Sequence, residues 1–302
     1  IHAQHTGGAR SRFSTPSRQV FKSMPDMLSQ QEKAHQFKAL HEAGECFIMP
    51  NPWDIGSARI LANLGYEALA TTSAGFANTQ GFTDYNVTRD MVMAHSRQLA
   101  NAVDLPLSAD LENGFGDDPE TCAETVRLAA EAGLVGGSIE DFTGIPGTQY
   151  DVGLAKARIE AAVDAANALD FPFMLTARAE NFFTGVPDLA DTITRLQAYQ
   201  EAGAHVLYAP GLKTLADIKT VITSVDRPVN VLMGPKSGFV PFEELAALGA
   251  ARISLGAALS NTAYGALVSA AREMLATGTL GFLSGAATGK ELGEMLTAGK
   301  PD

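Results

Sequence analysis

The sequence has few cysteines, little positive charge and no long apolar run, and each shortage excludes a class of protein. Its 302 residues include two cysteines, Cys46 and Cys122, without CxxC spacing, so neither a disulfide-stabilised fold nor a structural zinc site is expected. The formal net charge of −12 argues against a basic face for nucleic acid. No apolar run approaches the roughly 18 residues that cross a bilayer. We therefore expect neither a nucleic acid nor a membrane as partner, and a cytoplasmic location.

Acidic residues are missing from the first 25 residues, which carry Arg10, Arg12, Arg18 and Lys22. Such a bias is found in organelle-targeting peptides and equally in a tail unrelated to the fold. We therefore divide the chain into an N-terminal tail, residues 1–27, and a main domain, residues 28–302. Organelle targeting stays open.

The main domain shows a regular alternation of short apolar strands and helices. Eight apolar runs are each followed by a stretch with helical spacing, for example residues 105–109 before 119–132 and residues 229–233 before 242–248. Strands that alternate with helices of this length pair in parallel. Eight units without a GxGxxG motif favour an α/β fold of the closed (β/α)8 TIM-barrel type over an open dinucleotide-binding sheet. Residues 280–297 are apolar at helical intervals and predict extra C-terminal helices.

One stretch, Asp110-Leu-Glu-Asn-Gly-Phe-Gly116, carries two carboxylates where an apolar run ends. Residues two apart in a strand point the same way, so we expect Asp110 and Glu112 to project together. Such a pair suits a hard divalent cation such as Mg²⁺. The alternative is that both acids only solvate the strand end or cap the next helix.

In a barrel of this kind the chemistry lies at the C-terminal ends of the strands. The polar residues predicted there are Asn51, Trp53, Ser73, Asp110, Glu112, Glu140, Asp141, Arg178, Glu180 and Tyr208, with Asp84 in a nearby loop. Several acids around one arginine repel one another unless a cation neutralises them. Oxygen ligands without His or Cys favour Mg²⁺, or Mn²⁺, over zinc, together with an anionic substrate.

Several of these residues keep a structural alternative. Arg178 could only pair with a neighbouring carboxylate, and Trp53 could only pack at the rim. Asn230, within the seventh strand, could reach substrate or could bond to backbone. Lys236 could bind a phosphate, although its flanking glycines explain a turn. No lysine lies inside a strand, so a Schiff-base mechanism is not expected.

These residues resemble the isocitrate lyase/phosphoenolpyruvate mutase superfamily over residues 34–276. The motifs that carry the resemblance are Thr72-Ser-Ala-Gly75, Gly81-Phe-Thr-Asp84, Asp110-Leu-Glu-Asn-Gly-Phe-Gly116, Ile139-Glu-Asp141 and Thr176-Ala-Arg-Ala-Glu180. The resemblance implies an enzyme that binds Mg²⁺ and a 2-oxo acid and stabilises its enolate. It implies that Asp110 binds the metal directly, while Glu112, Asp84 and Glu140 hold it through water or neighbouring contacts.

The resemblance also implies the substrate contacts. Ser73, with the backbone of Ala74 and Gly75, would bind the substrate carboxylate. Arg178 would bind substrate oxygens and offset developing charge, with Glu140 beside it as a further catalytic residue.

The loop after Glu140-Asp141 departs from the better-known members. Isocitrate and methylisocitrate lyases carry a Lys-Arg/Lys-Cys-Gly-His loop whose cysteine is the general acid, whereas residues 142–151 read Phe-Thr-Gly-Ile-Pro-Gly-Thr-Gln-Tyr-Asp. The lysines and asparagine of the mutases and phosphonopyruvate hydrolases are absent as well. By its position, this loop suggests Tyr150 or Asp151 as the proton donor or base.

The sequence therefore predicts a Mg²⁺-dependent lyase that cleaves a C–C bond in a small 2-oxo acid or its aldol-type precursor through a metal-stabilised enolate. The alternatives are a phosphonate P–C mutase or hydrolase, an oxaloacetate decarboxylase, and a non-catalytic 2-oxo-acid-binding homologue. The resemblance further implies a homotetramer, a dimer of dimers, in which the last barrel helix packs on a neighbouring subunit.

Overall fold

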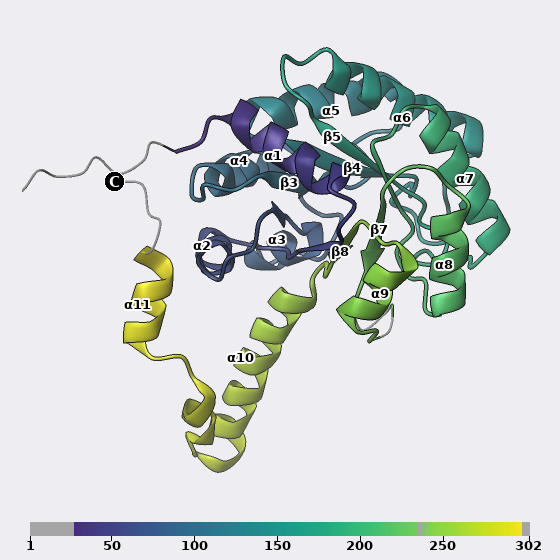
Figure 1. Cartoon of the computed structure of the whole chain (residues 1–302). Coiled ribbons are helices and arrows are strands. Elements are labelled where there is room, and N and C mark those ends of the chain that lie inside the picture. The colour runs from purple at the N-terminus through teal and green to yellow at the C-terminus, as the bar shows by residue number, and fades with distance from the viewer. Residues whose placement is uncertain (1–26, 235–236, 238, 298–302) are drawn as a thin grey trace, which may run out of the picture.

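The computed structural model describes residues 27–234, 237 and 239–297. Eight parallel strands form one sheet in the order β1-β8-β7-β6-β5-β4-β3-β2, and helices cover its outer face (Figure 1). The strands are β1 (Phe47–Met49), β2 (Leu69–Ala70), β3 (Leu107–Asp110), β4 (Gly136–Glu140), β5 (Met174–Arg178), β6 (Val206–Tyr208), β7 (Val229–Leu232) and β8 (Arg252–Ser254).

The sheet closes between its two edge strands through single contacts rather than a ladder. The backbone N–H of Ala70, in β2, donates to the carbonyl of Pro50, just after β1, at 3.1 Å. Asn51 donates from Nδ2 to the carbonyl of Thr71 at 3.1 Å and accepts the N–H of Leu255 at 2.8 Å. One amide side chain thus joins the ends of β1, β2 and β8, and the predicted (β/α)8 barrel is confirmed.

The helices follow the predicted alternation. They are α1 (Gln30–Glu42), α2 (Ile55–Asn63), α3 (Ser73–Thr79), α4 (Arg89–Ala100), α5 (Pro119–Glu131), α6 (Val152–Asn167), α7 (Leu189–Glu201), α8 (Leu215–Thr223), α9 (Phe242–Leu248), α10 (Ala258–Thr277), a 3-10 turn η1 (Gly281–Gly285) and α11 (Gly289–Thr297). Only the short α3 was not predicted, although Thr72 caps it by accepting the N–H of Gly75, which is an ordinary start signal.

Helix α1 covers the N-terminal end of the barrel. Phe37 of this helix is fully buried and belongs to a cluster with Val135 and Met174, at or next to the starts of β4 and β5. Apolar packing of α1 therefore covers the starts of β4 and β5.

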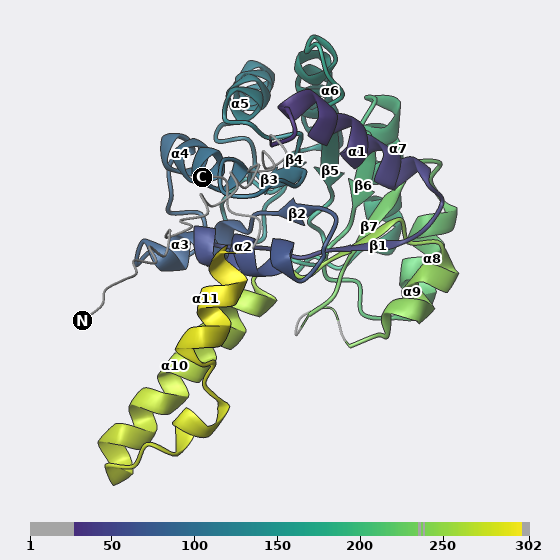
Figure 2. The ribbon, with the colours of Figure 1, turned by 60° about the vertical axis from the view of Figure 1, so that its left-hand side comes forward.

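The C-terminal arm, residues 258–297, extends away from the barrel in both views (Figures 1 and 2). Of the described α10 residues only Ser260 is buried, while Leu267 and Leu275 are 63% and 89% exposed. The arm then returns to α2, where Asn63 Nδ2 lies 3.1 Å from Met295 Sδ. The predicted C-terminal helices are present, and in the described part of the chain no helix is both long and apolar enough for a membrane span.

Candidate active site

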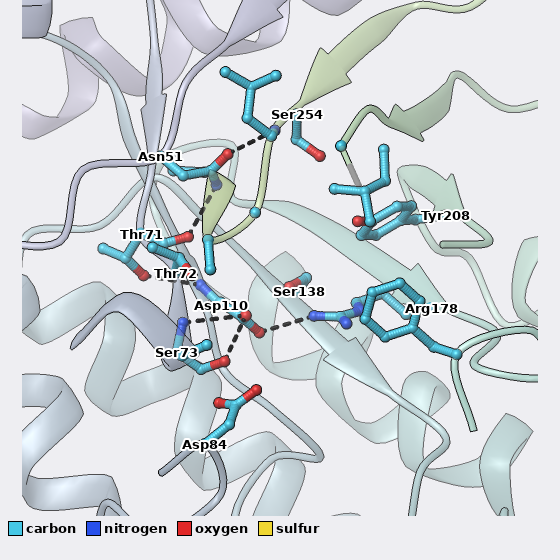
Figure 3. A pocket seen from close by; sticks show the side chains of 18 of the residues that line it. Asn51, Thr71, Thr72, Ser73, Asp84, Asp110, Ser138, Arg178, Tyr208 and Ser254 are labelled. Atoms are coloured by element: carbon cyan, nitrogen blue, oxygen red, sulfur yellow. Dashed lines mark hydrogen bonds and ion pairs between the residues drawn. The ribbon is translucent and has the colours of Figure 1, made fainter. Parts of the chain in front are cut away.

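A cavity of about 860 Å³ lies at the C-terminal ends of the strands. Its lining includes Asn51, Ser73, Ala74, Asp84, Tyr85, Asp110, Phe142, Arg178, Glu180, Tyr208, Asn230, Arg252 and Ser254, and Figure 3 shows the centre of this group. A second cavity of about 530 Å³ shares Tyr85 and Gly144 with the first and is lined by Glu112. Most of the polar residues predicted at the strand ends therefore meet here.

Arg178, the last residue of β5, holds three carboxylates together. Its Nη1 lies 2.9 Å from Asp110 Oδ1, its Nη2 lies 2.9 Å from Glu140 Oε2, and its Nε lies 2.8 Å from Glu180 Oε1. Arg178 is opposite Glu140 in the β4–β5 register, which explains the link between these two residues. Figure 3 shows the bond to Asp110 across the floor of the cavity. Arg178 therefore forms the ion pairs that its structural alternative requires, and it also lines the cavity.

These carboxylates are buried far enough to resist ionisation. Burial raises the pKa of Glu180 to about 7 and raises the pKa of Glu140 well above its usual value, although the Arg178 charge opposes both shifts. The same carboxylates raise the pKa of Arg178 despite its burial. One guanidinium thus does not neutralise the acids that surround it.

Two further carboxylates have oxygens without a partner. Asp84 Oδ1 and Glu112 Oε1 are buried and accept no hydrogen bond from the described residues. Burial, followed by the charges of Asp110 and Asp84, raises the pKa of Glu112 to about 8. Burial and the Asp110 charge likewise raise the pKa of Asp84. Buried acceptors of this kind are costly unless a cation or a donor satisfies them.

A hard divalent cation fits this donor set, because carboxylate oxygens are its preferred ligands. The four predicted ligands, Asp84, Asp110, Glu112 and Glu140, carry excess negative charge. Within residues 27–234, 237 and 239–297, however, no three such groups are already gathered around one point at ligand spacing. Arg178 holds Asp110 and Glu140, so side chains would have to rotate to converge on a cation.

The expectation that Asp110 and Glu112 project from one strand face is wrong. Strand β3 ends at Asp110, and Glu112 lies in a turn with φ +48°, so the two-residue period of a strand no longer applies. Among the described residues the non-glycine positions with positive φ are Tyr85, Glu112 and Phe115, and all three line one or both cavities. Such backbone costs about 1–3 kcal/mol per residue and clusters at functional sites.

The predicted carboxylate-binding segment starts α3. Ser73 donates from its backbone N and its Oγ to Asp110 Oδ2, at 3.3 and 3.0 Å, and Ala74 lines the cavity beside it. Gly75 lies behind the segment, where a Cβ would stand 2.6 Å from Thr72 Cγ2 and 3.0 Å from the Cβ of Trp53. Glycine is therefore required there for close packing, and neither Gly75 nor Trp53 lines the cavity.

Asn230 does line the cavity, and its partners are side chains rather than backbone. Its Nδ2 donates to Ser254 Oγ at 2.9 Å, and its Oδ1 accepts from Arg252 Nε at 3.0 Å. The strand-interior asparagine is thus part of a polar group inside the barrel.

The two proton carriers predicted in the loop lie outside the cavity lining. Tyr150 donates to Asp117 Oδ1 at 2.5 Å, and its ring lies 4.0 Å under the Arg158 guanidinium. Asp151 is exposed and caps α6 by accepting the N–H of Leu154. The structure therefore does not bring these two side chains to the site. Lys236 lies outside the described residues.

Tyr85 is the residue that the sequence prediction missed. It follows Asp84, its hydroxyl donates a short hydrogen bond to Glu140 Oε1, and its ring meets Phe142 edge-on with centroids 5.0 Å apart. Burial and the Glu140 charge raise the pKa of Tyr85 far above its usual value. The available signal was its position after the aspartate of a recognised motif.

The fold, with acids gathered around one arginine at its strand ends, defines a (β/α)8 barrel of the type whose active site lies at that face. A family model for phosphoenolpyruvate phosphomutase matches residues 37–275, and the chain belongs to that family, within the isocitrate lyase/phosphoenolpyruvate mutase superfamily. The predicted membership is confirmed.

Named relatives include lyases. The chain is 30% identical over 210 residues to 2-methylisocitrate lyase of Escherichia coli K12, covering 63% of this chain and 70% of that protein. It is 26% identical over 266 residues to oxaloacetate decarboxylase of Marinomonas sp. MWYL1, and the match covers 83% of this chain and 89% of that protein. A solved structure from Burkholderia cenocepacia J2315, described as a candidate lyase or mutase, is 52% identical to this chain, with a TM-score of 0.88. The match covers 90% of this chain and 99% of that one. The expectation of a lyase-type enzyme is confirmed.

Proposed function

We propose that this enzyme cleaves a C–C bond in a small 2-oxo acid, or in its aldol-type precursor, with a divalent cation at Asp84, Asp110, Glu112 and Glu140. The observation that carries the proposal is the excess of buried carboxylates, two of them with oxygens that lack a partner, around a single arginine. When bound, Mg²⁺ or Mn²⁺ would supply positive charge that stabilises an enolate. Oxygen donors alone favour these two ions.

Arg178 would bind substrate oxygens. Three of its five N–H donors face Asp110, Glu140 and Glu180, which leaves two for a ligand. A fixed guanidinium in a buried site stabilises charge that develops during bond cleavage, because the surrounding dipoles need not reorganise. The Ser73–Ala74 segment, beside Asp110, would take the substrate carboxylate.

Tyr85, rather than Tyr150 or Asp151, has the geometry of a proton carrier. Tyr85 lines the cavity and its hydroxyl donates to Glu140 Oε1, so the pair can pass a proton between tyrosine and carboxyl. The loop above it lines the cavity through Phe142, Gly144 and Pro146, none of which is an acid.

That loop favours a second candidate, decarboxylation of a 2-oxo diacid. Loss of CO₂ needs an enolate to be stabilised but needs no acid to protonate a leaving group. The named oxaloacetate decarboxylase relative agrees with this option. A P–C mutase or hydrolase is disfavoured, because the loop contains no lysine.

The C-terminal arm supports the proposed homotetramer. Its exposed apolar side chains, among them Leu267, Leu275 and Leu283, suit burial against another subunit. Light scattering should give four chains per particle, and removal of residues 258–302 should lower that number. A cytoplasmic location stays a prediction.

The test of the function has two parts. Calorimetry should show oxalate, an enolate mimic, binding in the presence of Mg²⁺ and not in its absence. NMR should then show turnover within a set of 2-oxo acids, 2-hydroxy diacids and phosphonates. Oxalate binding without any turnover would indicate a binding protein, and the absence of Mg²⁺-dependent binding would contradict the site assignment.

A further inference from the structure

Two buried arginines line the same cavity and differ in how their charge is compensated. Arg178 meets three carboxylates at 2.8–2.9 Å. Arg252, at the start of β8, is 3% exposed, and no described Asp or Glu forms an ion pair with it. A buried guanidinium without an anion is costly, because it has left water without gaining an opposite charge.

The partners of Arg252 among the described residues are uncharged. Its Nε donates to Asn230 Oδ1 at 3.0 Å, its Nη2 donates to Thr176 Oγ1 at 2.8 Å, and its Nη1 lies 3.0 Å from His41 Nε2. Burial and the Arg252 charge lower the pKa of His41 to about 3, so this imidazole is neutral at ordinary pH and accepts. Two of the five guanidinium N–H groups have no partner among the described residues.

Arg252 lies where it could reach the second end of a ligand whose first end binds near Arg178 in the same cavity. Arg252 is opposite Asn230 in the β7–β8 register and two residues before Ser254, so it lies deeper than the strand ends. Tyr208 lies between the two arginine neighbourhoods, with its ring 5.2 Å from the Arg178 guanidinium carbon. Figure 3 shows Tyr208 beside Arg178 and Ser254 across the same opening.

We propose that Arg252, with Asn230 and Ser254, forms a second anion subsite that takes the far carboxylate of a dicarboxylic substrate. The inference rests on the proposed function, because it requires the 2-oxo end of the substrate to bind near Asp110 and Arg178. Arg252 makes no contact with the predicted metal ligands and acts on specificity. A substrate with a single carboxylate would leave the positive charge of Arg252 without an anionic partner.

The test compares two ligands of equal length, 2-oxoglutarate and 2-oxopentanoate, which differ in the far carboxylate alone. Calorimetry in Mg²⁺ should show the dicarboxylate binding at least about 10-fold more tightly to the wild-type enzyme, since a hydrogen bond to a charged group is worth this much. Arg252→Gln should remove the preference and keep oxalate binding. Arg252→Lys should restore part of it.

Two controls separate this role from a structural one. Arg195→Gln removes a buried arginine outside the cavity and should keep the preference. Asn230→Asp supplies Arg252 with a carboxylate and should abolish the preference while raising the melting temperature, so it remains informative if Arg252→Gln does not fold.

The possible outcomes distinguish failure of the subsite from failure of the proposed function. A preference that survives Arg252→Gln, or a wild-type enzyme that binds oxalate yet shows no preference, would overturn the subsite and leave the proposed function standing. Absence of Mg²⁺-dependent oxalate binding would overturn both.

Discussion

Glu140 and Asp141 are adjacent in the sequence and belong to two different buried networks. Glu140 contacts two residues that line the cavity: it pairs with Arg178, which holds two other carboxylates as well, and it accepts a hydrogen bond from Tyr85. Asp141 faces the other way and accepts four hydrogen bonds at 2.6–3.0 Å, from Gln149, Arg195, Tyr199 and the N–H of Glu180.

The two networks differ in role: the Asp141 network stabilises the fold, and the Glu140 network belongs to the candidate active site. Every acceptor position of Asp141 has a donor, as expected of a group that holds β4, β5 and α7 together. The Glu140 side contains more acids than cations and has oxygens without partners nearby. Burial of excess charge costs stability, and on the Glu140 side a bound cation could relieve that cost.

Changing the central arginine of each network should give the largest contrast. Arg178→Gln should weaken Mg²⁺-dependent oxalate binding and turnover by about 100-fold or more and should lower the free energy of unfolding by about 3–5 kcal/mol, because three carboxylates lose their partner. Arg178→Lys should recover stability more than binding, since lysine lacks the planar fork. Calorimetry and urea unfolding measure both quantities.

Arg195→Gln serves as the matched change in the Asp141 network. It should lower the free energy of unfolding while oxalate affinity per folded molecule stays the same. Equal losses of oxalate affinity in the two arginine variants would contradict the division into two networks.

The adjacent acids offer a finer contrast. Asp141→Asn should lower the free energy of unfolding by about 2–3 kcal/mol, because hydrogen bonds to a charged acceptor are lost, with turnover nearly unchanged. Glu140→Gln should do the opposite. Burial raises the pKa of Glu140, so the unfolded chain loses this proton at a lower pH than the folded chain, and stability falls as the pH rises above the unfolded pKa.

A neutral glutamine removes that cost, so stability should change by only about 1 kcal/mol while turnover falls by about 100-fold. Urea unfolding and steady-state rates would reveal a reversed pattern, in which Glu140→Gln unfolds the enzyme and Asp141→Asn abolishes turnover.

Tyr85→Phe removes the hydroxyl that donates to Glu140 in the network beside the cavity. Turnover should fall by about 10–100-fold if Tyr85 carries a proton, whereas oxalate affinity should change little because oxalate needs no proton. The rate and the affinity are measured on the same preparation. A parallel loss of both would indicate that Tyr85 only positions Glu140.

Tyr150→Phe is the matched change outside the cavity and should have the smallest effect. It removes the bond to Asp117 and should cost about 1 kcal/mol of unfolding free energy. Turnover of the true substrate should be unchanged. A clear loss of turnover at equal stability would restore Tyr150 as a proton carrier.

The sequence was sufficient to predict the strand–helix order and the rim at which the acids gather, because parallel strands bring every C-terminal end to one face. Errors arose where local geometry decides. Glu112 was placed by strand periodicity, which stops at Asp110. Tyr150 was placed by its loop alone, whereas its hydroxyl turns toward Asp117. The sequence prediction omits Arg252, although a charged residue within an apolar strand is a signal that the sequence itself contains.

The amino-acid sequence by itself determined the barrel, the family and the set of acids at one end, since each follows from local patterns repeated along the chain. Only the tertiary structure decided that Glu140 meets Arg178 while Asp141 meets Arg195, and that Arg252 lies inside the barrel with no carboxylate partner in the described part of the chain. A strand pattern shows that neighbouring side chains point to opposite faces. The partners on each face come from strands and helices that are distant in the sequence. A buried charge needs compensating groups, and only folding brings these groups together.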